Sequence, residues 1–167
     1  MGRIYSLDWR IGLTVELALL VAMLAAPRPY GYLVALAMPL FRKQIRWAST
    51  NRRYILAGLA AYVTTFLADY IYVGPPHSVP PWWEAVVLAP IAEEFLFRAL
   101  PFSLLPAPAA WLISVPLFGA LHPANPVIAS LYGFSLTLAY RGGGYAASVA
   151  LHSFNNALWI ALATRSF

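Results

Sequence analysis

The sequence contains no cysteine, and only 10% of its residues are charged. The lack of cysteine excludes a disulfide framework and a cysteine nucleophile. Soluble domains usually carry about 25% charged residues, whereas 61% of this chain is hydrophobic. A water-soluble monomer of this composition would expose large apolar patches. We therefore expect lipid to surround most of the fold.

Acidic residues are also scarce, six against eleven lysines and arginines. A net charge of +5 can indicate nucleic-acid binding, but nearly half of the basic residues lie in one stretch between two apolar segments. That distribution is typical of a cytoplasmic loop of a membrane protein, so we expect membrane lipid and no nucleic acid as a partner. The clustered residues are Arg42, Lys43, Arg46, Arg52 and Arg53.

What the sequence does have is a series of long apolar runs. A spanning helix needs roughly 20 residues, so the chain can cross a bilayer about five or six times. Prolines separate runs 11–26 and 30–41, which predicts a helical hairpin whose second arm is short enough to be interfacial or re-entrant. The other expected helices are 54–73, 84–105, 107–121, 126–141 and 145–163.

These runs predict one integral membrane domain, residues 1–167, of the all-α class. We expect a polytopic transmembrane helix bundle with a polar cavity among the later helices. The expected location is multi-pass, in the cell membrane. Because an ionisable side chain in hydrocarbon is costly, the few polar residues within the runs are either functional or paired.

Two adjacent glutamates lie in the fourth long run. Glu94 and Arg98 are four residues apart in the favourable acid-first order, which predicts an ion pair. Glu93 is rotated by about 100° on the helix and lacks that partner. An unpaired carboxyl group in a low-dielectric site suits general acid–base chemistry. Alternatively, both carboxylates belong to a structural ion-pair network.

Two histidines follow in the later runs. His122 ends its helix, where it is either an interfacial hydrogen-bonding residue or a catalytic partner. His152 and Asn156 share one face of the last helix because they are four residues apart. Two hydrogen-bond donors on one face can bind an oxyanion. They can equally clamp two helices together.

Three short motifs therefore occur in order in successive hydrophobic segments: Glu93-Glu94-x-x-x-Arg98, Phe118-x-x-x-His122 and His152-x-x-x-Asn156. Each motif is weak alone, but the ordered set is specific. It resembles the CAAX-processing and bacteriocin-processing intramembrane endopeptidases (the CPBP or Abi family), which include the Ras-converting CAAX protease. The resemblance covers about residues 84–163.

The resemblance implies a hydrolase that attacks a peptide bond directly with water, without an acyl-enzyme and without a cofactor. In that mechanism Glu93 and His122 activate the water, and His152 and Asn156 stabilise the oxyanion. The supporting residues would be Glu94, Arg98 and Phe118. The chain has few spans before the first motif, so both CAAX-type and bacteriocin- or immunity-type processing stay open. The partner would be a peptide or protein substrate, either prenylated or a leader peptide.

Two other interpretations stay open. Glu93, His122 and His152 could supply the donor set of a catalytic zinc, although the sequence lacks His-Glu-x-x-His. In a non-enzymatic membrane transporter or immunity protein, the same groups would form a proton relay or a helix clamp. Asp69 and Glu16, which lie in apolar runs outside the motifs, would then matter more, whereas His77 lies in a proline-rich loop.

Overall fold

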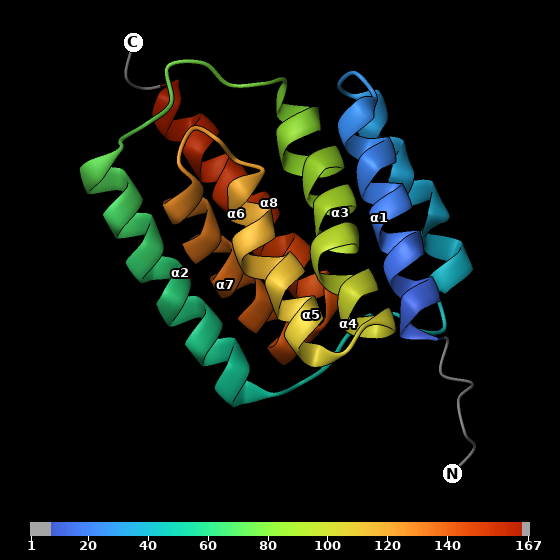
Figure 1. Cartoon of the computed structure of the whole chain (residues 1–167). Coiled ribbons are helices and arrows are strands. Elements are labelled where there is room, and N and C mark those ends of the chain that lie inside the picture. The colour runs from blue at the N-terminus through green and yellow to red at the C-terminus, as the bar shows by residue number, and fades with distance from the viewer. Residues whose placement is uncertain (1–7, 165–167) are drawn as a thin grey trace.

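The computed structural model describes residues 8–164, which fold into seven helical rods and contain no strand (Figure 1). This confirms the all-α prediction. Five rods are single elements: α1 (Trp9–Ala25), η1 (Tyr30–Phe41), α2 (Arg52–Tyr72), α7 (Pro126–Gly143) and α8 (Tyr145–Ala163). We call the rod that carries both glutamates the motif helix; it joins η2 (Glu84–Leu88), α3 (Ala89–Glu94), η3 (Phe95–Ala99) and α4 (Leu100–Leu104). The remaining rod joins α5 (Ala107–Leu112), η4 (Ile113–Leu117) and α6 (Phe118–Ala120).

Within the described residues, α2 is the one helix that is both long and apolar enough to cross a membrane by length and composition. The apolar helices Tyr30–Phe41 and Ala107–Ala120 are shorter. The helix boundaries lie close to those expected from the apolar runs, because turns rich in proline, glycine or charged residues separate these runs. The number of membrane crossings stays a prediction.

The expected N-terminal hairpin is present. Helix α1 turns at the prolines and η1 runs back beside it, on the right of the bundle in Figure 1. Gly31 is packed against the backbone carbonyl of Met23, where a β-carbon would not fit. Gly12 faces Leu104 at the end of the motif helix, where a β-carbon would lie 2.9 Å from the Leu104 carbonyl oxygen. Close packing at Gly31 thus holds the two arms of the hairpin together, and close packing at Gly12 holds the hairpin against the motif helix.

Wide turns accompany the prolines inside the rods. Elements η2, η3 and η4 are π-helical, and Pro90, Pro101 and Pro116 lie in or just after them. Proline lacks an N–H group, so it leaves an earlier carbonyl without its helical donor. The carbonyl of Phe97, four residues before Pro101, instead accepts a hydrogen bond from Ser114 Oγ at 2.5 Å. The prolines therefore free backbone acceptors for contacts between helices.

At one end of the bundle, the basic stretch packs directly on the turn between α7 and α8. Asn51 N donates to Gly142 O at 2.8 Å, and Arg46 Nη2 donates to Tyr140 O at 2.7 Å. Gly144 has a φ of 79°, a conformation that favours glycine. The basic stretch and the glycine turn thus lie at the same end of the bundle. Helix α2 rises from this end along the outer edge, opposite the hairpin (Figure 1).

Candidate active site

The predicted pair of Glu94 and Arg98 is formed at the centre of the protein. Arg98 Nη1 lies 2.9 Å from Glu94 Oε1, and both side chains are fully buried. Arg98 Nη2 also donates to the backbone carbonyls of Ser114 and Gly133, each at 3.3 Å. A buried charge is tolerated when it is paired and hydrogen-bonded. This pair therefore joins the motif helix to η4 and α7.

Phe118 packs against three of the motif side chains. Its ring centroid lies 4.2 Å from Arg98 Cζ, which is cation–π geometry. The ring also lies 4.5 Å from the centroid of His122 and 6.3 Å from that of His152. The sequence alone offered no physical role for Phe118 beyond the resemblance. The fold shows that its ring packs against the guanidinium of the ion pair and against both imidazoles.

His152 lies between the two glutamates. Its Nδ1 is 2.8 Å from Glu94 Oε1, and its Nε2 is 3.9 Å from Glu93 Oε2. Because the Glu94 carboxylate that pairs with Arg98 is an acceptor, Nδ1 of His152 is the donor in this contact. Glu94 therefore orients the ring so that Nε2 faces Glu93.

His122 is held by its own helix end. Its Nδ1 lies 2.7 Å from the carbonyl oxygen of Phe118. A carbonyl only accepts hydrogen bonds, so Nδ1 carries the proton and Nε2 of a neutral ring is left as an acceptor. Helix α6 ends two residues before His122, at Ala120, which lets the ring reach beyond the rod.

Asn156 connects α8 to the motif helix. Its Nδ2 donates to Ala85 O at 2.8 Å, and its Oδ1 accepts from Asn155 Nδ2 at 3.3 Å. In η2 the bonds join residues five apart, and Pro90 has no N–H to offer Ala85. The helix-clamp contact is thus real, and it occupies one of the two amide hydrogens of Asn156.

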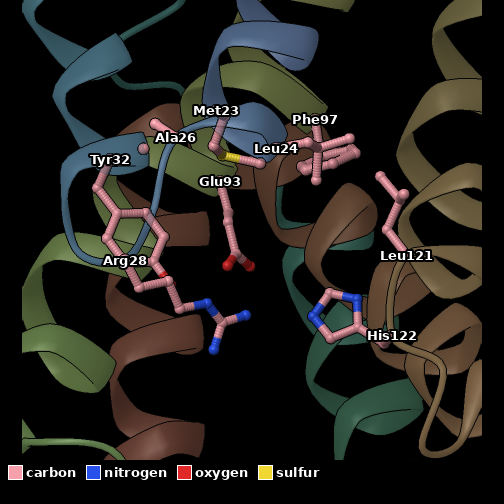
Figure 2. A pocket seen from close by; sticks show the side chains of 10 residues that line it. Met23, Leu24, Ala26, Arg28, Tyr32, Glu93, Phe97, Leu121 and His122 are labelled. Carbon is pink, nitrogen blue, oxygen red and sulfur yellow. The ribbon is translucent and has the colours of Figure 1, made fainter.

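A cavity of about 190 Å³ lies between the hairpin and the motif helix, and we call it the Glu93 cavity. Figure 2 shows the Glu93 carboxylate pointing into the space between the guanidinium of Arg28 and the ring of His122. Tyr32 also lines this cavity. Sequence reasoning missed Arg28 and Tyr32. The signal that could have indicated Arg28 is a charged residue between two prolines, at the turn that joins two apolar runs.

A second cavity, of about 110 Å³, lies between α2, α7 and α8. His122 lines it as well as the Glu93 cavity. We call it the histidine cavity, and its polar lining comes from Tyr62, His122, Tyr132, His152, Asn155 and Asn156. The seven predicted site residues thus form one connected cluster, with His122 in the wall between two cavities.

The carboxyl groups outside the motifs line neither cavity. Asp69 accepts a hydrogen bond from Tyr132 at 3.0 Å, and Trp159 donates to the same hydroxyl at 3.3 Å, which ties α2, α7 and α8 together. Glu16 is buried in α1 with no hydrogen-bond partner within residues 8–164. His77 lies in the loop between α2 and the motif helix. These positions do not extend the cluster.

A catalytic zinc site needs three protein ligands whose donor atoms converge on one metal position. Between residues 8 and 164, no group of three or more His, Cys, Asp or Glu side chains is arranged to hold a metal ion. Both ring nitrogens of His152 face glutamates, and Nδ1 of His122 is bonded to a carbonyl. These residues do not fit a zinc site as arranged, and chelation remains the direct test.

Comparison with known proteins identifies the family. Residues 75–158, about half of the chain, match the model of a family described as Type II CAAX prenyl endopeptidase Rce1-like. The matched region contains the three motifs and the whole motif helix. Comparisons with curated proteins and with solved structures gave no match. In agreement with the resemblance seen in its motifs, the chain belongs to the Rce1-like family of Type II CAAX prenyl endopeptidases.

Proposed function

We propose that this protein is an intramembrane endopeptidase in which Glu93 and His122 activate a water molecule that attacks the scissile carbonyl. Members of the family are membrane-embedded proteases that act on a peptide or protein. The observation that carries the proposal is the Glu93 carboxylate, which faces a cavity of about 190 Å³ together with His122. A carboxylate and an imidazole on one cavity can share the protons of a water between them.

Proton transfer follows from the hydrogen bonds of the cluster. Glu93 is free of the Arg98 ion pair, so its carboxylate can take a proton from water and return it to the leaving amine. The unbonded Nε2 of His122 accepts the second hydrogen of the same water and orients it. The water oxygen forms a bond to the carbonyl carbon, the C–N bond breaks, and the products are a carboxylic acid and an amine.

The contacts of His152 support an oxyanion role. Its Nδ1 lies 2.8 Å from Glu94 and its Nε2 lies 3.9 Å from Glu93, so the Nε2 edge of the ring faces the reacting carboxylate. In the imidazolium form, its Nε2–H and the second amide hydrogen of Asn156 can donate to the oxyanion. Glu94, Arg98 and Phe118 act by holding these groups in place.

We further propose that the chain is a multi-pass protein of the cell membrane with about five or six spanning helices. Helix α2 exposes Leu56, Leu67 and Ile71 on the outer edge of the bundle, where lipid rather than water suits them. The helical residues 82–104 form a rod of about 34 Å at ~1.5 Å per residue, which exceeds the ~30 Å hydrocarbon core. Helices α7 and α8 reach about 27–29 Å by the same measure.

The substrate proposal is a peptide that reaches the Glu93 cavity from the membrane, either a prenylated CAAX-type peptide or a leader peptide of bacteriocin or immunity type. The lining of the cavity includes the apolar side chains of Met23 and Leu24 as well as the charged side chains of Arg28 and Glu93. Such a lining accepts an apolar side chain beside a polar backbone. We propose no cofactor for the reaction.

The test uses wild type, Glu93→Gln and His122→Ala, purified in detergent and assayed on quenched peptides with and without prenyl groups. We expect cleavage by wild type, loss in both variants, and no effect of EDTA. Loss of wild-type activity in EDTA, restored by zinc, would replace the water mechanism with a metal mechanism. Activity that survives both substitutions would rule out the proposed site.

A further inference from the structure

The histidine cavity contains two buried polar atoms that the protein itself leaves without a partner. Tyr62 Oη and Asn155 Oδ1 are buried and have no hydrogen-bond partner within residues 8–164. Tyr62 is only 6% exposed, and both residues line the cavity. Buried polar atoms are nearly always hydrogen-bonded, to protein or to ordered water. A phenol and an amide oxygen on one small cavity therefore indicate a polar ligand.

The size of the cavity restricts that ligand. Its volume is about 110 Å³, and a water needs roughly 10–15 Å³ of this kind of space with two to four polar partners. A few waters therefore fit, and the space is smaller than the Glu93 cavity of about 190 Å³. The polar lining, which also includes His122, His152 and Asn156, offers the partners that such waters need.

The position of the cavity relates these waters to the reaction. His122 lines both cavities, and its unbonded Nε2 is an acceptor. His152 lines the histidine cavity while its Nε2 lies 3.9 Å from Glu93 Oε2. Only the imidazole rings of His122 and His152 thus separate a water in the histidine cavity from the Glu93 carboxylate. The substrate, which needs more room, enters on the hairpin side of the same histidine.

We propose that the histidine cavity holds the water consumed in hydrolysis before this water passes His122 to the Glu93 carboxylate, and that Tyr62 and Asn155 are its positioning residues. The presence of bound water is argued from the cavity alone, whereas its use in hydrolysis rests on the proposed function. Its oxygen bonds to the carbonyl carbon, one proton passes through Glu93 to the leaving amine, and the other stays on the new acid. The ring of Tyr62 is held for this role by Tyr132 and Phe154, at centroid distances of 6.1 and 6.3 Å.

The kinetic test removes one hydroxyl. In Tyr62→Phe we expect kcat to fall about tenfold with an unchanged KM, the effect of one lost hydrogen bond to the reacting water. Tyr70→Phe, on the exposed side of the same helix, should leave both constants unchanged. If the Tyr62 hydroxyl is a buried group without a ligand, its removal raises the melting temperature and leaves kcat intact. That result would overturn the proposal.

A second measurement does not depend on activity. X-ray pulses generate hydroxyl radicals from bound water, which oxidise neighbouring side chains even when they are buried. We expect Tyr62 and Tyr132 to be labelled several-fold faster than Tyr145, which is equally buried but lines neither cavity. Equal rates for Tyr62 and Tyr145 would overturn the water site. Fast labelling of Tyr62 together with full activity of Glu93→Gln would instead reject the proposed function and leave the water site standing.

Discussion

The two cavities that meet at His122 are lined by different parts of the chain. Apart from Tyr62 of α2, the residues that line the histidine cavity lie within the family match. The Glu93 cavity takes six of its ten lining residues from the hairpin, which precedes the match. Under the proposed function, the motif-bearing helices carry the chemistry, and the N-terminal hairpin, which has no recognisable motif, controls substrate access. Substitutions on the two sides should therefore change different kinetic constants.

The largest effect should come from Glu93→Gln. The substitution keeps the shape of the side chain and removes the base, so kcat should fall about a thousandfold. Glu93 is outside the Arg98 ion pair, and the melting temperature should stay close to that of wild type. Peptide cleavage and thermal unfolding in the same detergent check both expectations. A large loss of stability would show that Glu93 is mainly structural.

The neighbouring variant Glu94→Gln should behave in the opposite way. It leaves a fully buried Arg98 without its countercharge and His152 without its acceptor. Breaking a buried pair costs about 3–5 kcal/mol, so the protein should unfold at a much lower temperature. In the double variant Glu94→Gln/Arg98→Met, part of this stability should return because no charge is left unpaired. A Glu94→Gln protein as stable as wild type would contradict the paired assignment.

Phe118→Leu should have an intermediate effect. The cation–π contact with Arg98 is lost, worth about 2 kcal/mol when desolvated, and His122 and His152 lose the ring that orients them. We expect kcat to fall roughly tenfold with a small change in KM. Phe102→Leu, which removes a ring of the same size away from both cavities, is the matched control. Equal kcat and KM values in Phe118→Leu and Phe102→Leu would show that Phe118 has no positioning role.

The smallest effect should come from Arg28→Ala on the hairpin side. Arg28 is exposed, and exposed charges contribute at most about 1 kcal/mol, so KM should rise about fivefold or less with kcat unchanged. Arg53→Ala, in the basic stretch at the start of α2, should leave both constants unaltered. A decrease in kcat at unchanged KM would place Arg28 among the catalytic residues and remove the contrast between the two sides.

Much of the fold was predictable because exposing apolar side chains to water and burying unpaired charges are both unfavourable. Apolar runs of helical length and proline-rich turns located the rods to within a few residues. Because a buried charge is unfavourable unless it is paired, the sequence indicated an ion pair with Arg98. The four-residue spacing identified Glu94 as the partner and left Glu93 outside the pair. The partner of Asn156 was not predictable. Its contact with Ala85 depends on a carbonyl freed by Pro90 and on the packing of α8 against η2.

By itself, the sequence determined the all-helical class, the Glu94–Arg98 pair and the family, since local periodicity and residue spacing are properties of the chain. Only the tertiary structure decided that His122 lies between two cavities, that Arg28 and Tyr32 face Glu93, and that Tyr62 enters the site from α2. These relations join segments separated by up to about a hundred residues. Side-chain packing decides them, and no pattern within one helix encodes which faces will meet.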